Sequence, residues 1–277
     1  MASAAHKYSK LDIPEVLAVT FHPQPEPSEQ SIPANAVDLT IPVADGVELG
    51  ARFFMTDDPK AVNILFFHGN GEIVADYNDV GPMYNEQNIN LLAVDYRGYG
   101  RSNGTPTISN MMTDAVTVLN ETKKWLKAHN REGYLVVMGR SLGCVPALEL
   151  AAEHAEDTAA LIVESGFAET LPLLENLGIK TADLDLTESD CFYNVEKIRK
   201  ITKPVLIIHA QKDSLIPLEQ AMTLHAECEA RAKEIQIVPG ADHNNIFDIA
   251  GRIYFEVVKM FVNKIGMRKR PKKMGVR

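Results

Sequence analysis

The most constraining feature of this chain is an apolar run that stops at a glycine-flanked serine. Residues 134–138 favour a strand, and Gly139, Ser141 and Gly143 follow it as a G-x-S-x-G pattern. Residues 144–154 then favour a helix, with apolar side chains at helical spacing. A serine at the tip of a sharp strand-to-helix turn has a strained backbone and needs neighbours without side chains. The pattern therefore predicts a nucleophile elbow with Ser141 at its tip.

Strands and helices are expected to alternate through most of the chain. Eight strands are predicted, at residues 37–43, 47–55, 61–67, 89–94, 134–138, 159–163, 205–208 and 235–238. Helices are predicted at residues 76–87, 111–129, 144–154, 218–231 and 244–261. Several strands are almost continuously apolar, which is typical of strands buried on both faces of a parallel sheet. The predicted fold class is therefore α/β, with a mostly parallel eight-stranded sheet, right-handed crossovers and helices on both faces.

The chain of 277 residues is expected to form one catalytic domain with two flanking segments. Its hydrophobic content of 45% and charged content of 23% are ordinary for a globular protein with a sizeable core. Residues 1–35 are rich in proline, which fixes φ and lacks an N–H, and are predicted to form an extended arm. Residues 36–263 form the predicted catalytic domain, and residues 264–277 form a basic tail.

Charge is divided unevenly between the domain and the tail. Residues 264–277 hold seven of the 28 basic residues and none of the 37 acidic ones, so the rest of the chain carries a net charge of −16. An acidic body argues against nucleic acid as a partner, because phosphate binding needs a basic surface. The tail is predicted to be a solvated segment or, alternatively, one that touches anionic membrane surfaces.

Cysteine spacing and hydropathy bear on the location of the protein. Cys144, Cys191 and Cys228 fit neither a disulfide framework nor a metal site, which indicates free thiols in a reducing compartment. We expect no metal and no other cofactor. The chain opens without a signal-type apolar region, and no run approaches the ~18 apolar residues that span a bilayer. These features predict a soluble, cytoplasmic protein without stable membrane insertion, and they leave its oligomeric state open.

A serine nucleophile needs a base, and the base needs an acid that orients it. Asp213 follows the strand at residues 205–208, and His243 follows the strand at residues 235–238. The order Ser, Asp, His is that of the α/β-hydrolase fold. Asp242 competes for the role of the acid, but a side chain seldom points at the imidazole of its neighbour in sequence. Ser141, His243 and Asp213 are therefore the predicted catalytic triad.

From about residue 37 to residue 261 the chain resembles the α/β-hydrolase superfamily. The resemblance rests on the elbow and on three further blocks, His-Gly-Asn-Gly at 68–71, Asp-Tyr-Arg-Gly-Tyr-Gly-x-Ser at 95–102 and Lys-Pro-Val-Leu-Ile-Ile-His at 203–209. Together they resemble the small-lid branch that includes acyl-protein thioesterases (depalmitoylating hydrolases) and serine-aminopeptidase-like proteins. Membrane-bound eukaryotic members carry an N-terminal cysteine cluster, which residues 1–35 lack.

The resemblance implies a serine hydrolase that cleaves esters or thioesters of small or acylated substrates. It also implies that the backbone N–H groups of Asn70 and Leu142 form the oxyanion hole. About 40 residues separate the strands that end at residue 163 and begin at residue 205, so a short insert is expected instead of a large cap. Its apolar cluster either roofs an acyl pocket or packs the insert down. The cluster comprises Leu171, Leu173, Leu174, Leu177 and Ile179.

Two alternative functions remain open at this level. A serine aminopeptidase would need carboxylates that hold a substrate ammonium, and Glu164, Glu169 and Asp190 lie in the right region, although solvated or structural roles also suit them. Glu164, Leu171 and Leu174 are the candidate substrate contacts. A non-catalytic binding module is the second alternative, because fold does not imply function. The complete Ser-His-Asp set argues against it.

Overall fold

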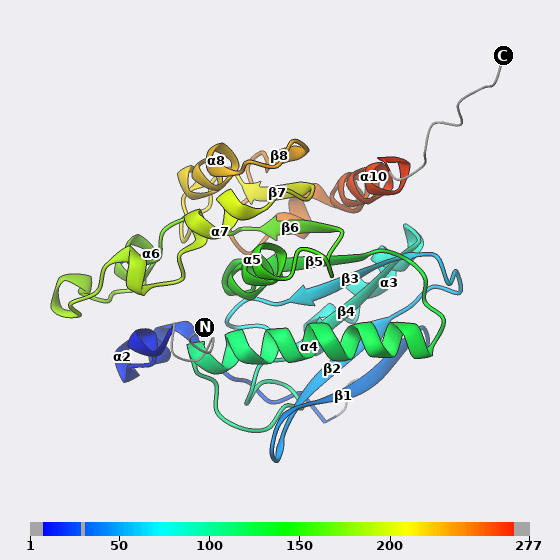
Figure 1. Ribbon diagram of the computed structural model, residues 1–277, viewed down its shortest axis with the longest axis horizontal. Helices are drawn as coiled ribbons and strands as arrows, with labels where there is room; N and C mark the ends of the chain where they lie inside the picture. Colours follow the sequence, from blue (N-terminus) through cyan, green and yellow to red (C-terminus); the bar gives the residue numbers. More distant parts are fainter. Residues whose placement is uncertain (1–7, 29–30, 269–277) are drawn as a thin grey trace.

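All eight predicted strands are present in the computed structural model, which describes residues 8–28 and 31–268 (Figure 1). They are β1 (Ala36–Ala44), β2 (Val47–Phe54), β3 (Val62–Phe67), β4 (Ile89–Val94), β5 (Leu135–Arg140), β6 (Ala160–Glu164), β7 (Val205–Ala210) and β8 (Lys233–Val238). The sheet order is β1-β2-β4-β3-β5-β6-β7-β8. Strand β2 pairs antiparallel with β1 and β4, and the pairs from β4 to β8 are parallel. The predicted fold class is confirmed.

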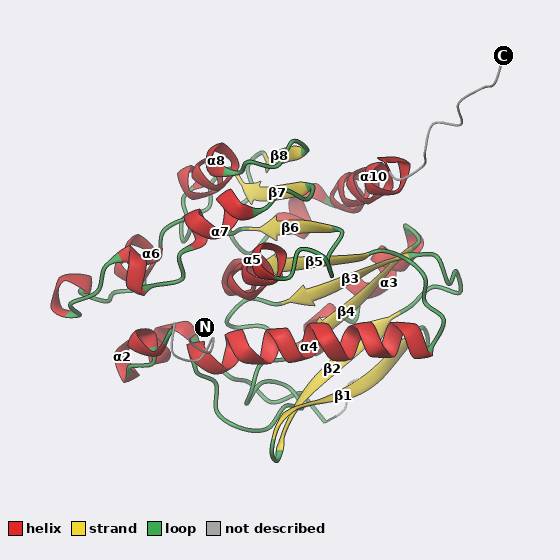
Figure 2. Cartoon of the chain, viewed as in Figure 1, coloured by secondary structure: helices red, strands yellow, loops and turns green. Residues whose placement is uncertain are grey.

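Helices cover both faces of this sheet (Figure 2). One face packs against α4 (Ile108–Ala128), α5 (Cys144–Glu153), α7 (Asn194–Lys200) and α8 (Leu218–Glu227). The other face packs against α3 (Val80–Glu86), α9 (Ile246–Ala250) and α10 (Arg252–Arg268). The continuous apolar strands supply both cores at once, because successive side chains point to opposite faces. In β3, for example, Leu65 and Phe67 join the first core and Ile64 and Phe66 join the second.

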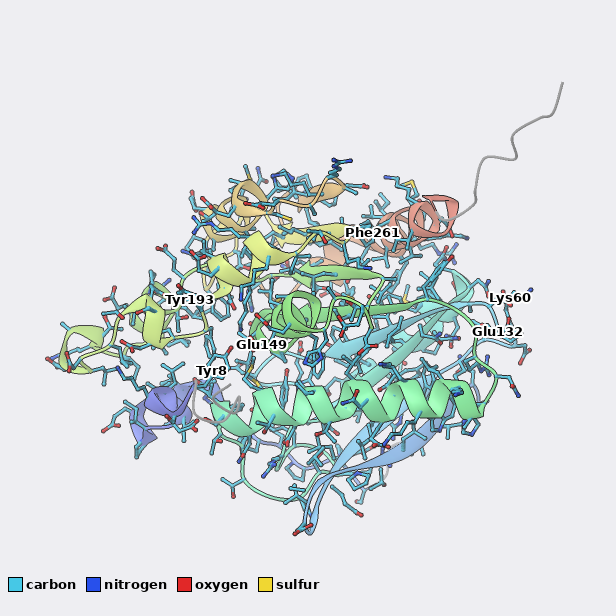
Figure 3. The ribbon with its side chains drawn as sticks, viewed as in Figure 1. Tyr8, Lys60, Glu132, Glu149, Tyr193 and Phe261 are labelled. Atoms are coloured by element: carbon cyan, nitrogen blue, oxygen red, sulfur yellow. The ribbon has the colours of Figure 1, made fainter. Side chains whose placement is uncertain are left out.

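The segment before β1 differs from the prediction, because it contains the helix α2 (Pro14–Thr20). Pro14 occupies the start of this helix, where an N–H has no intrahelical acceptor and proline is favoured. Upstream, the Tyr8 hydroxyl donates to Glu149 Oε2 on α5 at 2.6 Å (Figure 3). The predicted extended arm is therefore wrong for this stretch, since proline at a helix start supports the helix that it would break elsewhere.

The C-terminal part of the domain differs from the prediction in two ways. The closing helix predicted at residues 244–261 is divided into α9 and α10 at Gly251, whose φ of 52° is left-handed and ends α9. Helix α10 also continues past residue 263 and includes Lys264, whose Nζ lies 2.8 Å from a carboxylate oxygen of Glu234. The rest of the predicted basic tail, residues 269–277, lies outside the described residues.

The short insert between β6 and β7 consists of α6 (Thr170–Asn176), two 3₁₀ turns, η4 (Thr181–Asp183) and η5 (Glu188–Asp190), and α7. Helix α6 lies at the same end of the molecule as α2, and the parallel strands point toward that end (Figure 1). The carboxyl ends of these strands therefore face the two helices. This end of the sheet is where open α/β folds place their ligands.

The strand-to-helix turn after β5 has the close contacts that its sequence predicts. Ser141 has a φ of 52°, and the 3₁₀ turn η3 (Ser141–Gly143) leads from it into α5. A Cβ added to Gly139 would lie 2.0 Å from the carbonyl oxygen of Gly143, and one added to Gly143 would lie 2.0 Å from that of Phe67. Both neighbours are backbone atoms, so they cannot move aside alone. The two glycines are required by this geometry.

Gly143→Ala should lower the free energy of unfolding by about 1–3 kcal/mol or more, because overpacking forces the backbone to shift. Gly71→Ala is the matched control, since a Cβ there would meet no atom within 4 Å. Urea unfolding of both variants measures the difference. Equal free energies of unfolding for the two variants would show that the turn tolerates a side chain.

Candidate active site

Ser141, His243 and Asp213 meet at the carboxyl end of the sheet, where they follow β5, β8 and β7. His243 Nε2 lies 3.0 Å from Ser141 Oγ, and His243 Nδ1 lies 2.8 Å from Asp213 Oδ2. The other oxygen of Asp213 accepts the backbone N–H groups of Ile216, at 2.8 Å, and Leu215, at 3.1 Å. All three side chains are buried or nearly so. This arrangement can deprotonate the serine and stabilise the resulting imidazolium.

Asp242 does not compete with Asp213 for the imidazole. Its Oδ1 accepts the backbone N–H of Ser214 at 2.9 Å, and both its oxygens lie 3.2 Å from the Ser214 hydroxyl. His209 is a further neighbour of Asp213, with its Nε2 3.6 Å from Asp213 Oδ2 and 2.8 Å from the carbonyl oxygen of Ile216. Burial lowers the pKa of His209, which favours the neutral form of this imidazole beside Asp213.

Asn70 and Leu142, the predicted oxyanion residues, line the same pocket as Ser141. The carbonyl oxygen of Asn70 accepts the Tyr99 hydroxyl at 2.7 Å and the backbone N–H of His22 at 3.3 Å. Within the described part of the chain, the Asn70 N–H has no acceptor. Leu142 belongs to the first helical turn after the nucleophile, where N–H groups lack intrahelical acceptors. Both N–H groups are thus available beside Ser141.

The pocket beside Ser141 is small and largely apolar, with a cavity volume of about 40 Å³. Leu174 lines it as predicted, together with Leu173 and Leu177 of the same cluster. Leu171 does not line it: its side chain packs against the core, and its N–H donates to Glu188 Oε1 at 2.6 Å. Leu171 is thus absent from the lining of this pocket, and its role as a substrate contact stays a prediction.

Helix α2 supplies a wall of the pocket that sequence reasoning missed. Val19 and Thr20 lie in the lining, and Asn70 Nδ2 donates to the carbonyl oxygen of Val19 at 3.4 Å. A proline-rich segment gave no sign of this role. The only available signal was the pair of apolar residues Val16 and Leu17 after Pro14, at the start of a helix.

Glu164 is wrong as a substrate contact, because it lies beneath the site with no exposed surface. The Tyr254 hydroxyl donates to its Oε2, and Arg140 Nε lies 3.2 Å from its Oε1. Burial raises the pKa of Glu164, an effect that the positive charge of Arg140 opposes. The other two acids considered for an ammonium site are absent from the pocket lining, and Asp190 pairs with Lys10 at 2.6 Å.

Arg140, the residue before the nucleophile, joins three parts of the site. Its Nη2 donates to the carbonyl oxygen of His243 at 2.8 Å and to Asn244 Oδ1 at 3.0 Å. Its Nη1 donates to Glu72 Oε1 at 2.5 Å, and the other oxygen of Glu72 accepts the Gly69 N–H at 2.7 Å. The turn of Ser141, the loop of His243 and the loop of Gly69 therefore share one largely buried ionic network, which the G-x-S-x-G pattern did not reveal.

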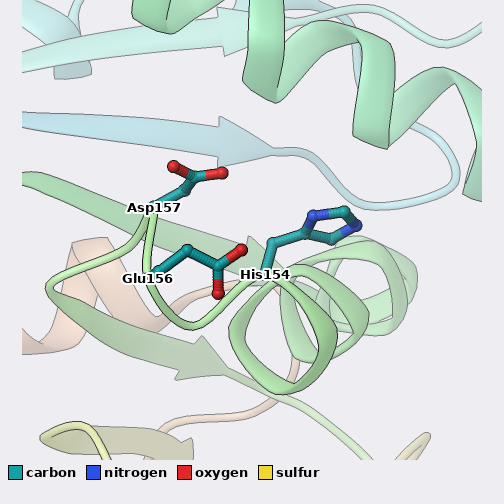
Figure 4. Close-up of side chains that lie close together, drawn as sticks. All are labelled: His154, Glu156 and Asp157. Atoms are coloured by element: carbon teal, nitrogen blue, oxygen red, sulfur yellow. The ribbon is translucent and has the colours of Figure 1, made fainter.

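A separate group of potential metal ligands lies in the turn after α5 (Figure 4). Ligand atoms of His154, Glu156 and Asp157 lie within 4.8 Å of one another. Asp157 already pairs with Lys123, and α5 separates the group from Ser141 by about 15 Å at 1.5 Å per residue. This group is therefore not part of the site.

The described helices include none that is long and apolar enough to cross a bilayer.

Known proteins resemble this chain in both sequence and fold. A family model described as "Serine aminopeptidase, S33" matches residues 57–179. The human alpha/beta hydrolase domain-containing protein 17B is 34% identical over 224 residues, which cover 77% of this chain and 71% of the human protein. The chain belongs to the family of these alpha/beta hydrolase domain-containing proteins. It is therefore a hydrolase, as its sequence predicts.

Solved structures show the same fold for this α/β-hydrolase. An esterase from Pyrococcus furiosus superimposes with a TM-score of 0.70 at 18% identity, covering 88% of this chain and 99% of the esterase. A monoglyceride lipase from Saccharomyces cerevisiae superimposes with a TM-score of 0.64 at 18% identity, covering 88% and 99% of the two chains. The predicted resemblance to the α/β-hydrolase superfamily is confirmed.

Arg140→Met should lower kcat by about 10- to 100-fold with little change in KM, because the loops of His243 and Gly69 lose their common tether. It should also destabilise the fold by about 3–5 kcal/mol, since buried carboxylates lose their partner. Arg52→Met is the control: Arg52 is 1% exposed and ion-paired with Asp38 and Glu26, outside the site. Steady-state kinetics and unfolding separate the two effects. Equal losses of kcat in both variants would show that Arg140 contributes only to the stability of the fold.

Proposed function

We propose that this hydrolase cleaves carboxylic esters and thioesters through an acyl-enzyme on Ser141. The observation that carries the proposal is the unbroken set of hydrogen bonds from Ser141 Oγ through His243 to Asp213. An apolar pocket adjoins the serine and suits the acyl group of a substrate. The membership of the chain in an α/β-hydrolase family supports the same class of reaction.

The mechanism uses the groups of the chain in two half-reactions. His243 Nε2 takes the Ser141 proton as Oγ attacks the carbonyl carbon, while Asp213 orients the imidazole and stabilises its cation. The N–H groups of Asn70 and Leu142 stabilise the oxyanion. The imidazolium then protonates the departing alcohol or thiol. In the second half-reaction His243 activates a water molecule, which releases the acid and restores Ser141.

A serine aminopeptidase is the second candidate, because the description of the matching family model names that activity. Such an enzyme needs a carboxylate beside the scissile bond to hold the free ammonium of its substrate. The pocket lining contains no carboxylate among the described residues. Glu164 already pairs with Arg140, and Asp190 pairs with Lys10. The contacts therefore favour esters and thioesters.

The proposal includes a cytoplasmic location and a small or acylated substrate as the partner. The three cysteines are buried free thiols, and burial raises the pKa of each, to about 12 for Cys191. The net charge of −9 disfavours nucleic acid as a partner.

Ser141→Ala should lower the turnover of a p-nitrophenyl ester by roughly 10⁴-fold and leave the fold intact, because triad members act as a unit. Labelling with a fluorophosphonate probe gives an independent readout. The parent should form one adduct, on Ser141, and the variant none. A folded parent that takes up no probe would favour the non-catalytic binding module.

Substrates with different leaving groups distinguish the esterase hypothesis from the aminopeptidase hypothesis. The p-nitrophenyl esters of short acyl chains should be cleaved with a higher kcat/KM than aminoacyl anilides with a free N-terminus, because no carboxylate anchors their ammonium. Glu169→Gln should leave this order unchanged, since Glu169 is exposed outside the pocket. Faster cleavage of the anilides, with a preference that Glu169→Gln removes, would make the enzyme an aminopeptidase.

We also propose that the basic tail contacts anionic membrane surfaces. Truncation after Arg268 removes residues 269–277 and retains all of α10. The full chain should bind phosphatidylserine vesicles at low salt and lose binding steeply between about 50 and 200 mM salt, while the truncated chain should not bind. Vesicle co-sedimentation measures both. Binding that is insensitive to salt or to truncation would leave the tail as a solvated segment.

A further inference from the structure

We propose that Tyr99 is a positioning residue for the oxyanion hole, and that it acts together with His22 on Asn70. The inference rests on the proposed function, because it takes the N–H of Asn70 as a donor to the oxyanion. Tyr99 belongs to the block at residues 95–102, to which the catalytic mechanism gives no role.

Side chains hold the loop of residues 68–70 at each of its three carbonyl oxygens. Two of the donors are tyrosine hydroxyls from the block at residues 95–102, and the third is an imidazole nitrogen within the loop. This nitrogen carries a proton, since a carbonyl oxygen only accepts. The bonds are Tyr96 Oη to His68 O, His68 Nδ1 to Gly69 O and Tyr99 Oη to Asn70 O, each at 2.7 Å.

The same loop leaves one backbone donor for a substrate. The N–H of Gly69 donates to Glu72 Oε2 at 2.7 Å, whereas the N–H of Asn70 has no acceptor in the described part of the chain. The N–H of Asn70 shares a planar peptide unit with the carbonyl of Gly69, so it points away from that oxygen. The direction of this N–H therefore depends on the bonds that hold the neighbouring carbonyls.

Tyr99 donates to Asn70 from a fixed position, because its side chain is fully buried. Between centroids, its ring lies 5.5 Å from that of His68 and 5.6 Å from that of Tyr96. Burial raises the pKa of Tyr99, so the hydroxyl keeps its proton and can donate. Packing of the three rings thus places the Tyr99 hydroxyl at the carbonyl of Asn70.

His22, in the segment after α2, contacts both members of this bond. Its backbone N–H is shared between Tyr99 Oη, at 2.6 Å, and the carbonyl oxygen of Asn70, at 3.3 Å. Its imidazole Nδ1 lies 3.3 Å from Asn70 Nδ2. Asn70 is therefore held through its carbonyl and through its side chain.

Backbone bonds join the segment after α2 to the block that carries Tyr99. The N–H of Gly100 donates to the carbonyl oxygen of Gln24 at 2.8 Å, and the carbonyl oxygen of Gly100 accepts the N–H of Glu26 at 3.3 Å. The segment before β1 thus helps to hold the oxyanion loop, in addition to lining the pocket through α2.

The test compares Tyr99→Phe with the parent in cleavage of a p-nitrophenyl ester and in inhibition by a trifluoromethyl ketone. Ser141 Oγ adds to the carbonyl carbon of the ketone and His243 takes the serine proton, which gives a hemiketal oxyanion that needs the same N–H donors. Tyr99→Phe should lower kcat by about 10- to 100-fold and change KM by less than about threefold, because the donor at Asn70 is misplaced. The Ki of the ketone should rise by about the same factor as kcat falls.

Tyr84→Phe is the matched control, because it also removes a buried hydroxyl. Tyr84 is 2% exposed and lies in the core on the other face of the sheet, where its hydroxyl is 3.2 Å from that of Tyr254. This variant should keep kcat and Ki within about threefold of the parent, since it leaves the oxyanion loop unchanged.

A kcat of Tyr99→Phe within about threefold of the parent, an unchanged Ki, or equal losses in the Tyr84 variant would overturn the inference. If Tyr99→Phe does not fold, as judged by thermal unfolding, His22→Ala tests the contact with Asn70, since it removes only an exposed imidazole. Its kcat should fall by about twofold to tenfold at constant KM, and an unchanged kcat would overturn the inference. A folded parent that neither cleaves the ester nor binds the ketone would count against the proposed function instead.

Discussion

The strained backbone of Ser141 is the constraint on which the rest of the site depends. A non-glycine residue in the left-handed region costs about 1–3 kcal/mol and persists only where the surroundings fix it. Here β5 enters the turn from the middle of the sheet, and Gly143 packs against the carbonyl of Phe67 at the end of β3. This contact places the first turn of α5 beside the loop that carries Asn70. The same packing therefore holds Ser141 at the tip of the turn and brings Asn70 and Leu142 into the pocket beside it.

A buried ionic network holds the other parts of the site against this turn. Burial alone would lower the pKa of Arg140, and the carboxylates of Glu72 and Glu164 outweigh it, so the pKa is raised and the guanidinium stays charged. Desolvated ions are costly unless paired, so such a network is retained where geometry matters more than stability. Arg140 meets the loop of His243 through its carbonyl oxygen and the loop of Gly69 through Glu72. A single side chain thereby ties these two loops to the turn that carries Ser141.

The sequence predicted those features that depend on short stretches of the chain. The strands, the elbow and the order of Ser141, Asp213 and His243 follow from apolar runs and from motifs with a fixed spacing. The failures involve tertiary contacts. The charge of Glu164 suggested a contact with a substrate ammonium, whereas the sheet register buries it beside Arg140. Helix α2 forms at a proline that starts it, and only the folded chain brings Val19 to the pocket.

Formation of a covalent intermediate on Ser141 tests the central claim most directly. The parent enzyme would be mixed with p-nitrophenyl butyrate, quenched in acid during turnover, digested and analysed by mass spectrometry. We expect the mass of one butyryl group on the peptide that contains Ser141, with fragmentation that locates it on the serine. Turnover with no acylated Ser141 peptide, or acylation of a different residue, would contradict the assignment of Ser141 as the nucleophile.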